Sequence, residues 1–166
     1  IIVNRSLVQL VPNLEKVLTS DNDPLARLHA LWTLDGLSKL SNKVALVALK
    51  DTDDRVVSAA LRSINWEPIY YPQIKTVIAD SSPRVIAHVI LALGQNDFEV
   101  SKDLILECIS RFPMNELVLR SVLAVVSRED LRNYKDEIIS NRFFKENNKT
   151  KESEKWLKRW NDFVLN

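Results

Sequence analysis

The apolar positions of this chain follow a helical period, and that period returns at a nearly constant distance along the sequence. In LKDTDDRVVSAALRSI, residues 49–64, apolar side chains recur every three or four positions, as on one face of a helix. Placing Pro24, Asp54, Pro83 and Asn115 in one column aligns DPLARLHAL, DDRVVSAAL, SPRVIAHVI and NELVLRSVL, with steps of 30, 29 and 32 residues. Helical patterning with a period in this range predicts a solenoid of stacked helix pairs.

Local signals predict where the helices begin and end. An Asp-Asn-Asp run precedes Pro24, which is the arrangement of a capping side chain followed by a proline in the first turn. The helix that starts there is expected to run to about Lys39, with Gly36 permitting close packing. Gly94 and Asn96 are expected to supply a left-handed exit from a later helix.

The predicted fold is all-α: a right-handed α-α superhelix, that is, a solenoid of about four helical hairpins plus a C-terminal capping helix. We expect one domain over residues 1–166, with repeats at about 1–21, 22–52, 53–81, 82–112 and 113–146. Because each repeat should contact only its neighbours, the predicted core comprises Leu28, Leu31, Val57, Leu61, Val89, Ile90, Val122 and Leu123. The apolar start without a polar cap leads us to expect that the chain is a piece of a longer protein.

The last stretch departs from the repeat. After a polar spacer, a helix is expected over residues 151–165, with Trp156, Trp160 and Phe163 on one side. Two interpretations remain open. The helix caps the last repeat, or its aromatic side chains bind a partner as anchors in a groove.

Composition narrows the classes of partner. With 23 basic and 22 acidic residues the net charge is +1, so no global field attracts nucleic acid, and we do not expect nucleic acid as the partner. No apolar run approaches the roughly 20 residues that span a bilayer, so no membrane insertion is expected. Two glycines leave little material for a glycine-rich phosphate loop. We expect a monomer without a cofactor.

The segments LKDTDDRVVSAALRSI and IADSSPRVIAHVILALG resemble HEAT repeats of the short, phycobilisome-lyase-like type, in which an acidic or proline loop precedes valine, arginine and a run of alanines. ARLHALWTLDGL and VALVALKDTDDRVVSAALR resemble, more narrowly, the HEAT region of large bacterial dehydrogenase-like proteins. In those proteins a β-propeller precedes the repeats and a c-type cytochrome domain follows them. The likeness covers roughly residues 20–95.

This resemblance implies a connecting module of an exported, haem-containing dehydrogenase, with a periplasmic or otherwise extracytoplasmic location. The chain departs from the whole-protein pattern because it has no CxxCH for covalent haem attachment and no propeller. Any electron-transfer chemistry would therefore belong to flanking domains.

Charged residues on the first two repeats suggest a structural ion pair. Asp35 lies one turn from Trp32 on the first long helix, and the column spacing brings the second repeat alongside. We therefore expect Asp35 to pair with Arg55 or Arg62. An acid beside a buried aromatic ring could instead have a raised pKa.

The remaining reactive residue types favour structural roles. His29 and His88 occupy equivalent columns two repeats apart, too far to share a metal ion that needs three or four ligands at about 2.0–2.3 Å. Cys108 lies among apolar residues and is expected to be an inert core thiol. Trp32 and Trp66 stand where a repeat core needs bulk.

The function expected from these patterns is a noncatalytic helical-repeat scaffold that holds a protein partner or a flanking domain of the same chain. Its second-helix face is expected to line the binding surface. The alternatives are a HEAT-like DNA-binding or DNA glycosylase module, and the linker module of an exported haem-containing dehydrogenase. Binding to duplex DNA separates the first alternative from the scaffold.

Overall fold

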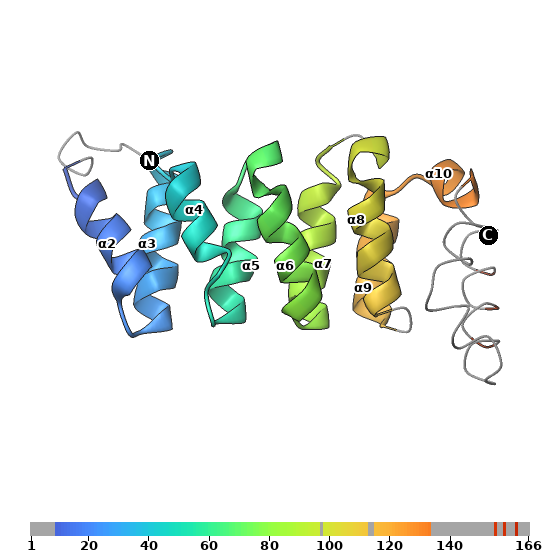
Figure 1. Cartoon of the computed structure of the whole chain (residues 1–166), viewed down its shortest axis with the longest axis horizontal. Helices are drawn as coiled ribbons and strands as arrows, with labels where there is room; N and C mark the ends of the chain where they lie inside the picture. Colours follow the sequence, from blue (N-terminus) through green and yellow to red (C-terminus); the bar gives the residue numbers. More distant parts are fainter. Residues whose placement is uncertain are drawn as a thin grey trace. The chain divides into compact units, whose positions relative to one another are not determined.

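A computed structural model of the chain describes residues 9–96, 98–112 and 115–133, together with positions 155, 158 and 162. All regular structure in these residues is helical, and no strand occurs among them, so the protein is all-α over this part (Figure 1). The elements are α2 (Val11–Ser20), α3 (Pro24–Gly36), α4 (Asn42–Ala48), α5 (Asp54–Ser63), η1 (Pro68–Tyr70), α6 (Tyr71–Asp80), α7 (Pro83–Leu93), α8 (Phe98–Arg111), α9 (Glu116–Val125) and α10 (Arg128–Asn133).

The chain divides into two compact units, Ile1–Val89 and Ile90–Asn166. In the first unit α3 lies against both α2 and α5, and α4 lies against α2 and α5. The helices α2 to α6 follow one another there in chain order (Figure 1). In the second unit α8 packs against α9.

Capping side chains start the helices where the sequence predicts. The Asp23 carboxylate accepts a hydrogen bond from the backbone N–H of Leu25 at 2.9 Å, and Asp53 accepts from the N–H of Arg55 at the same distance. Asn115 caps α9 in the same way. Each capping oxygen satisfies an N–H that the helix itself leaves unpaired. The starts at Pro24, Asp54 and Pro83 agree with the sequence, and α9 begins one residue after Asn115.

Helix α3 ends earlier than expected, and a serine, not a glycine, takes the left-handed conformation at its end. Ser38 has φ 55°, the left-handed conformation that usually falls to glycine at a helix end. The N–H of Lys39 bonds to the carbonyl of Leu34, and the N–H of Ser38 bonds to that of Asp35, both at 2.8 Å. This is a Schellman motif, and it stops α3 at Gly36 instead of near Lys39.

The core follows the predicted period. Leu31, Leu61 and Ile90 occupy the same position of successive repeats, and none exposes any surface. Helix α5 is buried over six consecutive positions, Val56 to Leu61, because it packs against helices on more than one side. The other predicted core residues are buried as well, except Leu123, which is half-buried. It lies one position beyond the buried face of α9, which is formed by Val118, Ser121 and Val122.

Neither glycine has the role that the sequence predicts. Gly94 does not adopt a left-handed conformation, and a Cβ added there would lie 2.3 Å from both Cβ and Cγ1 of Val125. Gly36, expected to permit close packing, has no other heavy atom within 4 Å of such a Cβ. The close approach of Gly94 to Val125 of α9 therefore requires a glycine at this position.

Replacing Gly94 by alanine is expected to lower the free energy of unfolding by about 1–3 kcal/mol, because the new methyl group overlaps Val125. The same change at Gly36 is expected to raise it by about 0.4–1 kcal/mol, since alanine fits the space and restricts the unfolded chain. Urea midpoints of the two variants measure both effects. Equal stabilities for the two alanine variants would contradict the assignment of Gly94 as the packing glycine.

Candidate functional site

One enclosed surface in the first unit lies along the first helices of three repeats, α3, α5 and α7. Side chains four residues apart line it on each helix: two on α3, three on α5 and two on α7, with one more arginine from α5. They enclose about 240 Å³. We call this the arginine groove, and its residues are Leu28, Trp32, Asp54, Arg55, Ser58, Arg62, Arg84 and His88.

Two of the three arginines in the groove are free to bind an anion. Arg55 is held by Asp53, with its Nη2 2.7 Å from the carboxylate. Neither Arg62 nor Arg84 forms an ion pair with a residue that the structure describes, and both side chains are exposed. The Asp54 carboxylate in the groove already accepts a hydrogen bond from the Ser82 hydroxyl at 2.6 Å. The groove therefore carries unpaired positive charge on two helices.

Two polar atoms without partners belong to side chains that line the groove. Ser58 Oγ and His88 Nδ1 are enclosed, and neither has a hydrogen-bond partner among the described residues. Burial lowers the pKa of His88, and the positive charges of Arg62 and Arg84 lower it further. Ser58 is unusual for its position, because Leu28 and Ala87 occupy the equivalent place in the neighbouring repeats and are buried.

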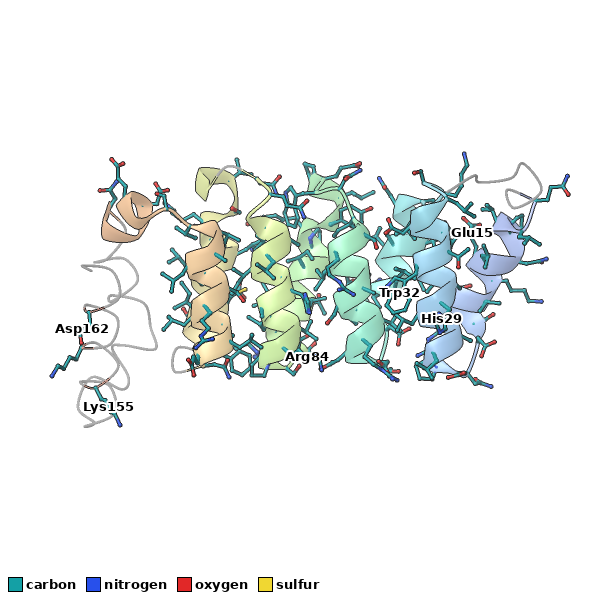
Figure 2. The ribbon with its side chains drawn as sticks, turned by 180° about the vertical axis from the view of Figure 1, so that it is seen from behind. Glu15, His29, Trp32, Arg84, Lys155 and Asp162 are labelled. Atoms are coloured by element: carbon teal, nitrogen blue, oxygen red, sulfur yellow. The ribbon has the colours of Figure 1, made fainter. Side chains whose placement is uncertain are left out.

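Trp32 forms an aromatic wall of the groove, which corrects its expected place in a core. The side chain is 45% exposed and lies on the side of α3 that faces α5 (Figure 2). The ring of His29 meets it edge-on, with centroids 5.6 Å apart and an interplanar angle of 80°. Trp66, also expected in a core, is half-buried. A large exposed indole next to unpaired guanidinium groups is a common feature of recognition surfaces.

The expected ion pair of Asp35 with Arg55 or Arg62 is not formed, and Asp35 is exposed. In aligned repeats Asp35 lies ten positions further along its helix than Arg55, or about 15 Å at 1.5 Å per residue. Arg55 instead pairs with the capping carboxylate of its own helix. Arg62 lies at a helical position closer to that of Asp35, but its side chain lines the groove with Trp32.

A different ion pair joins the first two repeats. Arg27 Nε and Nη2 each lie 2.7 Å from an oxygen of Asp51, and Arg27 Nη1 donates to the Asp21 carbonyl at 2.8 Å. The Arg27 and Asp51 side chains are 13% and 7% exposed. The hydrogen bond to Asp51 raises the pKa of Arg27. We call this pair the inter-repeat clasp. In the sequence its signal is an arginine that follows the capping residue Asp23 by four positions and precedes the loop of Asp51 by one repeat.

The same loop chemistry is repeated at the start of α3 and of α5. Asp21 accepts from the N–H of Asp23 at 2.8 Å, and Asp51 accepts from the N–H of Asp53 at 2.8 Å. In each loop the first aspartate closes a turn and the second caps the helix. Asp51 adds the clasp to this turn, so the loop both starts a helix and binds the preceding repeat.

The carboxyl of Asp53 should make the stability of the fold depend on pH. Hydrogen bonds from the side chain and backbone of Arg55 lower its pKa to about 2 from 3.8. A lowered native pKa adds stability that is present above the unfolded pKa and is lost as pH falls through the native value.

We therefore expect the stability difference between the wild type and Asp53→Asn to shrink between about pH 4 and about pH 2. Asparagine retains the cap, so the lost contribution is the ion pair with Arg55. Urea unfolding at several pH values measures the difference. A difference that stays constant over this range would show that the ion pair does not contribute to folding.

A larger cavity of about 510 Å³ lies between the α4–α5 loop and α6. Its lining includes Asp51, which is held by Arg27, and Asp54, which accepts from Ser82. Two of the three aspartates in its lining therefore already have partners, and it lacks the exposed aromatic ring of the arginine groove. We therefore take the arginine groove as the candidate site.

Other reactive groups are placed as follows. Cys108 is fully buried, and burial raises the pKa of its thiol, so the thiol is inert. In the part of the chain that the structure describes, no three His, Cys, Asp or Glu side chains come together as a metal site. Likewise, no helix among the described residues is long and apolar enough to cross a membrane.

The predicted partner-binding aromatics Trp156, Trp160 and Phe163 lie outside the described residues. Near them, Lys155, Lys158 and Asp162 are helical and exposed. The cap and partner-binding interpretations of residues 151–165 both stay predictions.

Scans of the chain against protein-family models, curated proteins and solved structures returned no match.

Proposed function

We propose that the protein is a noncatalytic, HEAT-like repeat scaffold whose helix pairs stack as a right-handed superhelix and hold a protein partner. The observation that carries the repeat architecture is the span of the long-range side-chain hydrogen bonds in the first unit. Arg27–Asp51, Ser41–Glu15, Asn42–Glu67, Tyr70–Asn42 and Ser82–Asp54 join residues 24 to 28 positions apart. Bonds of this span link each repeat to the next, as expected of a stack in which a repeat contacts its neighbours.

The proposed partner surface is the arginine groove. This places it on the first helices of the repeats, whereas the sequence analysis favoured the second helices. The support is chemical: the groove combines an exposed indole at Trp32, unpaired guanidinium groups at Arg62 and Arg84, and enclosed polar atoms without partners. Tryptophan and arginine contribute a large share of binding energy at protein interfaces.

Site-specific photo-crosslinking tests the proposal. Benzoylphenylalanine at His29, beside Trp32, should crosslink a protein in the source cells, and the same probe at Thr76 of α6 should capture much less of it. The captured protein is then purified and its affinity for wild type and for Arg62→Gln/Arg84→Gln is measured. Equal capture at both positions, or equal affinity for both proteins, would count against a partner surface at the groove.

Duplex DNA is the competing ligand. Its binding should be weak, and any residual affinity should fall steeply between about 50 and about 200 mM salt. Tight binding that survives this increase and depends on Trp32 or Arg62 would favour the DNA-processing alternative over the scaffold.

A further inference from the structure

Two unpaired guanidinium groups from different helices line the same groove as one half-buried imidazole. Arg62 of α5, Arg84 of α7 and His88 all line the arginine groove, and neither arginine has an acidic partner among the described residues. The two positive charges also lower the pKa of His88. From this convergence we infer that the arginine groove binds the carboxylate of an aspartate or glutamate in an acidic segment of the partner. The inference rests on the proposed function and names the chemistry of its ligand.

Guanidinium and carboxylate groups match in geometry as well as in charge. An arginine can donate two parallel hydrogen bonds to one carboxylate, and such charge-assisted bonds are roughly twice as strong as neutral ones. Trp32 comes from α3, Arg62 from α5 and Arg84 from α7, and all three side chains line the same space. Figure 2 labels Trp32 and Arg84 on their two helices. The volume of about 240 Å³ suits one side chain, whose aliphatic stem would lie against the indole.

The unpaired polar atoms of Ser58 and His88 in the groove agree with this ligand. Enclosed hydroxyl and imidazole groups are normally hydrogen-bonded, and leaving them unpaired costs free energy. Ser58 stands where adjacent repeats bury Leu28 and Ala87, so packing alone does not require a hydroxyl there. An anion drawn in by the arginines provides the acceptor that the Ser58 hydroxyl lacks.

The charge pattern favours an acidic peptide over a nucleic acid backbone. Asp54 lines the groove, and Arg55 beside it is neutralised by Asp53. Two free cations and one acid in the same groove suit a single carboxylate, whereas a phosphate backbone requires a row of cations that extends along the surface.

Fluorescence anisotropy with a defined probe tests the inference. The probe is a fluorescein-labelled peptide in which glutamate alternates with alanine, and its control is the same peptide with glutamine in place of glutamate. The wild type should bind the glutamate peptide and not the glutamine peptide. Arg62→Gln/Arg84→Gln should weaken binding by about tenfold or more, because both charge-assisted contacts are lost.

A matched control variant separates the groove from overall charge. Lys16→Gln/Lys43→Gln removes the same net charge at exposed positions outside the groove and should change affinity by less than about twofold. Ser58→Ala should weaken binding while leaving the urea midpoint unchanged or raised, because it removes an unpaired buried hydroxyl.

Three results would overturn the inference: no binding of the glutamate peptide, equal losses for the arginine and lysine variants, or tighter binding of a single-stranded DNA of equal charge. The proposed function fails separately. If crosslinking at His29 still identifies a protein whose binding needs the groove, the scaffold stands and only the acidic chemistry is wrong.

Discussion

Replacing Leu61 by alanine should lower the free energy of unfolding by about 2 to 5 kcal/mol, the cost of removing a fully buried leucine and leaving a cavity. Leu61 exposes no surface, and it stands in the same repeat position as Leu31 and Ile90, which are buried to the same degree. Its helix has no exposed side between Val56 and Leu61 into which the surroundings could relax.

Urea denaturation measures this loss, and Leu25→Ala provides the matched control. Leu25 lies on α3 and is 46% exposed, so the same change there should cost under about 1 kcal/mol. A Leu61→Ala protein with a wild-type midpoint, or a loss no greater than that of Leu25→Ala, would refute the assignment of Leu61 to the core.

Breaking the inter-repeat clasp is the second large effect. Arg27→Ala and Asp51→Ala should each lower the free energy of unfolding by about 2 to 4 kcal/mol, because each leaves the other charge largely buried without its partner. Asp51→Ala also removes the acceptor for the N–H of Asp53. We therefore expect Asp51→Asn to be less damaging than Asp51→Ala.

A double-mutant cycle isolates the pair itself. The coupling energy between Arg27 and Asp51 should exceed about 1 kcal/mol, since the two side chains are bidentate and mostly buried. The exposed pair Glu116–Arg120 on α9 is the control, and its coupling should be about 0.3–0.5 kcal/mol. Similar coupling energies for the two pairs would show that the clasp contributes no more than a surface ion pair.

Helix starts could be predicted from the sequence because they depend on neighbouring residues alone. Asp53 caps the helix that follows it whatever lies across the core, and Pro24 fixes the backbone of the first turn. The buried positions Leu31 and Leu61 follow from the same local period. The all-helical character of the described residues therefore required only local reasoning.

Contacts between repeats depend on the register of two helices, which the period sets only approximately. The proposed pairing of Asp35 with Arg55 ignored a difference of ten helical positions, and counting the rise per residue would have excluded it. The clasp between Arg27 and Asp51 was missed because a loop aspartate followed by a helix is typical of local turn and cap contacts. Asp51 also turns toward the preceding repeat.

The candidate site was missed because Trp32 was placed by its residue type and not by its position on the helix. Trp32 was assigned to a core for its size, yet it follows the buried Leu31 by one residue. The equivalent positions in the next repeats hold Arg62 and Leu91, and both are exposed. Trp32 and Arg62 of that column line the groove, and the arginine was the available signal.

The central claim is that the arginine groove is where a partner binds, and NMR of the His88 imidazole tests it most directly. The chain has two histidines, so a His29→Gln variant leaves the ring signals of His88 alone. On titration with the glutamate peptide, these signals should shift and saturate with the binding curve, because the bound carboxylate approaches a ring that lines the groove together with Arg62 and Arg84. In Arg62→Gln/Arg84→Gln the same shifts should require at least about tenfold more peptide. If the peptide binds the His29→Gln variant and the His88 signals do not shift, the account is contradicted.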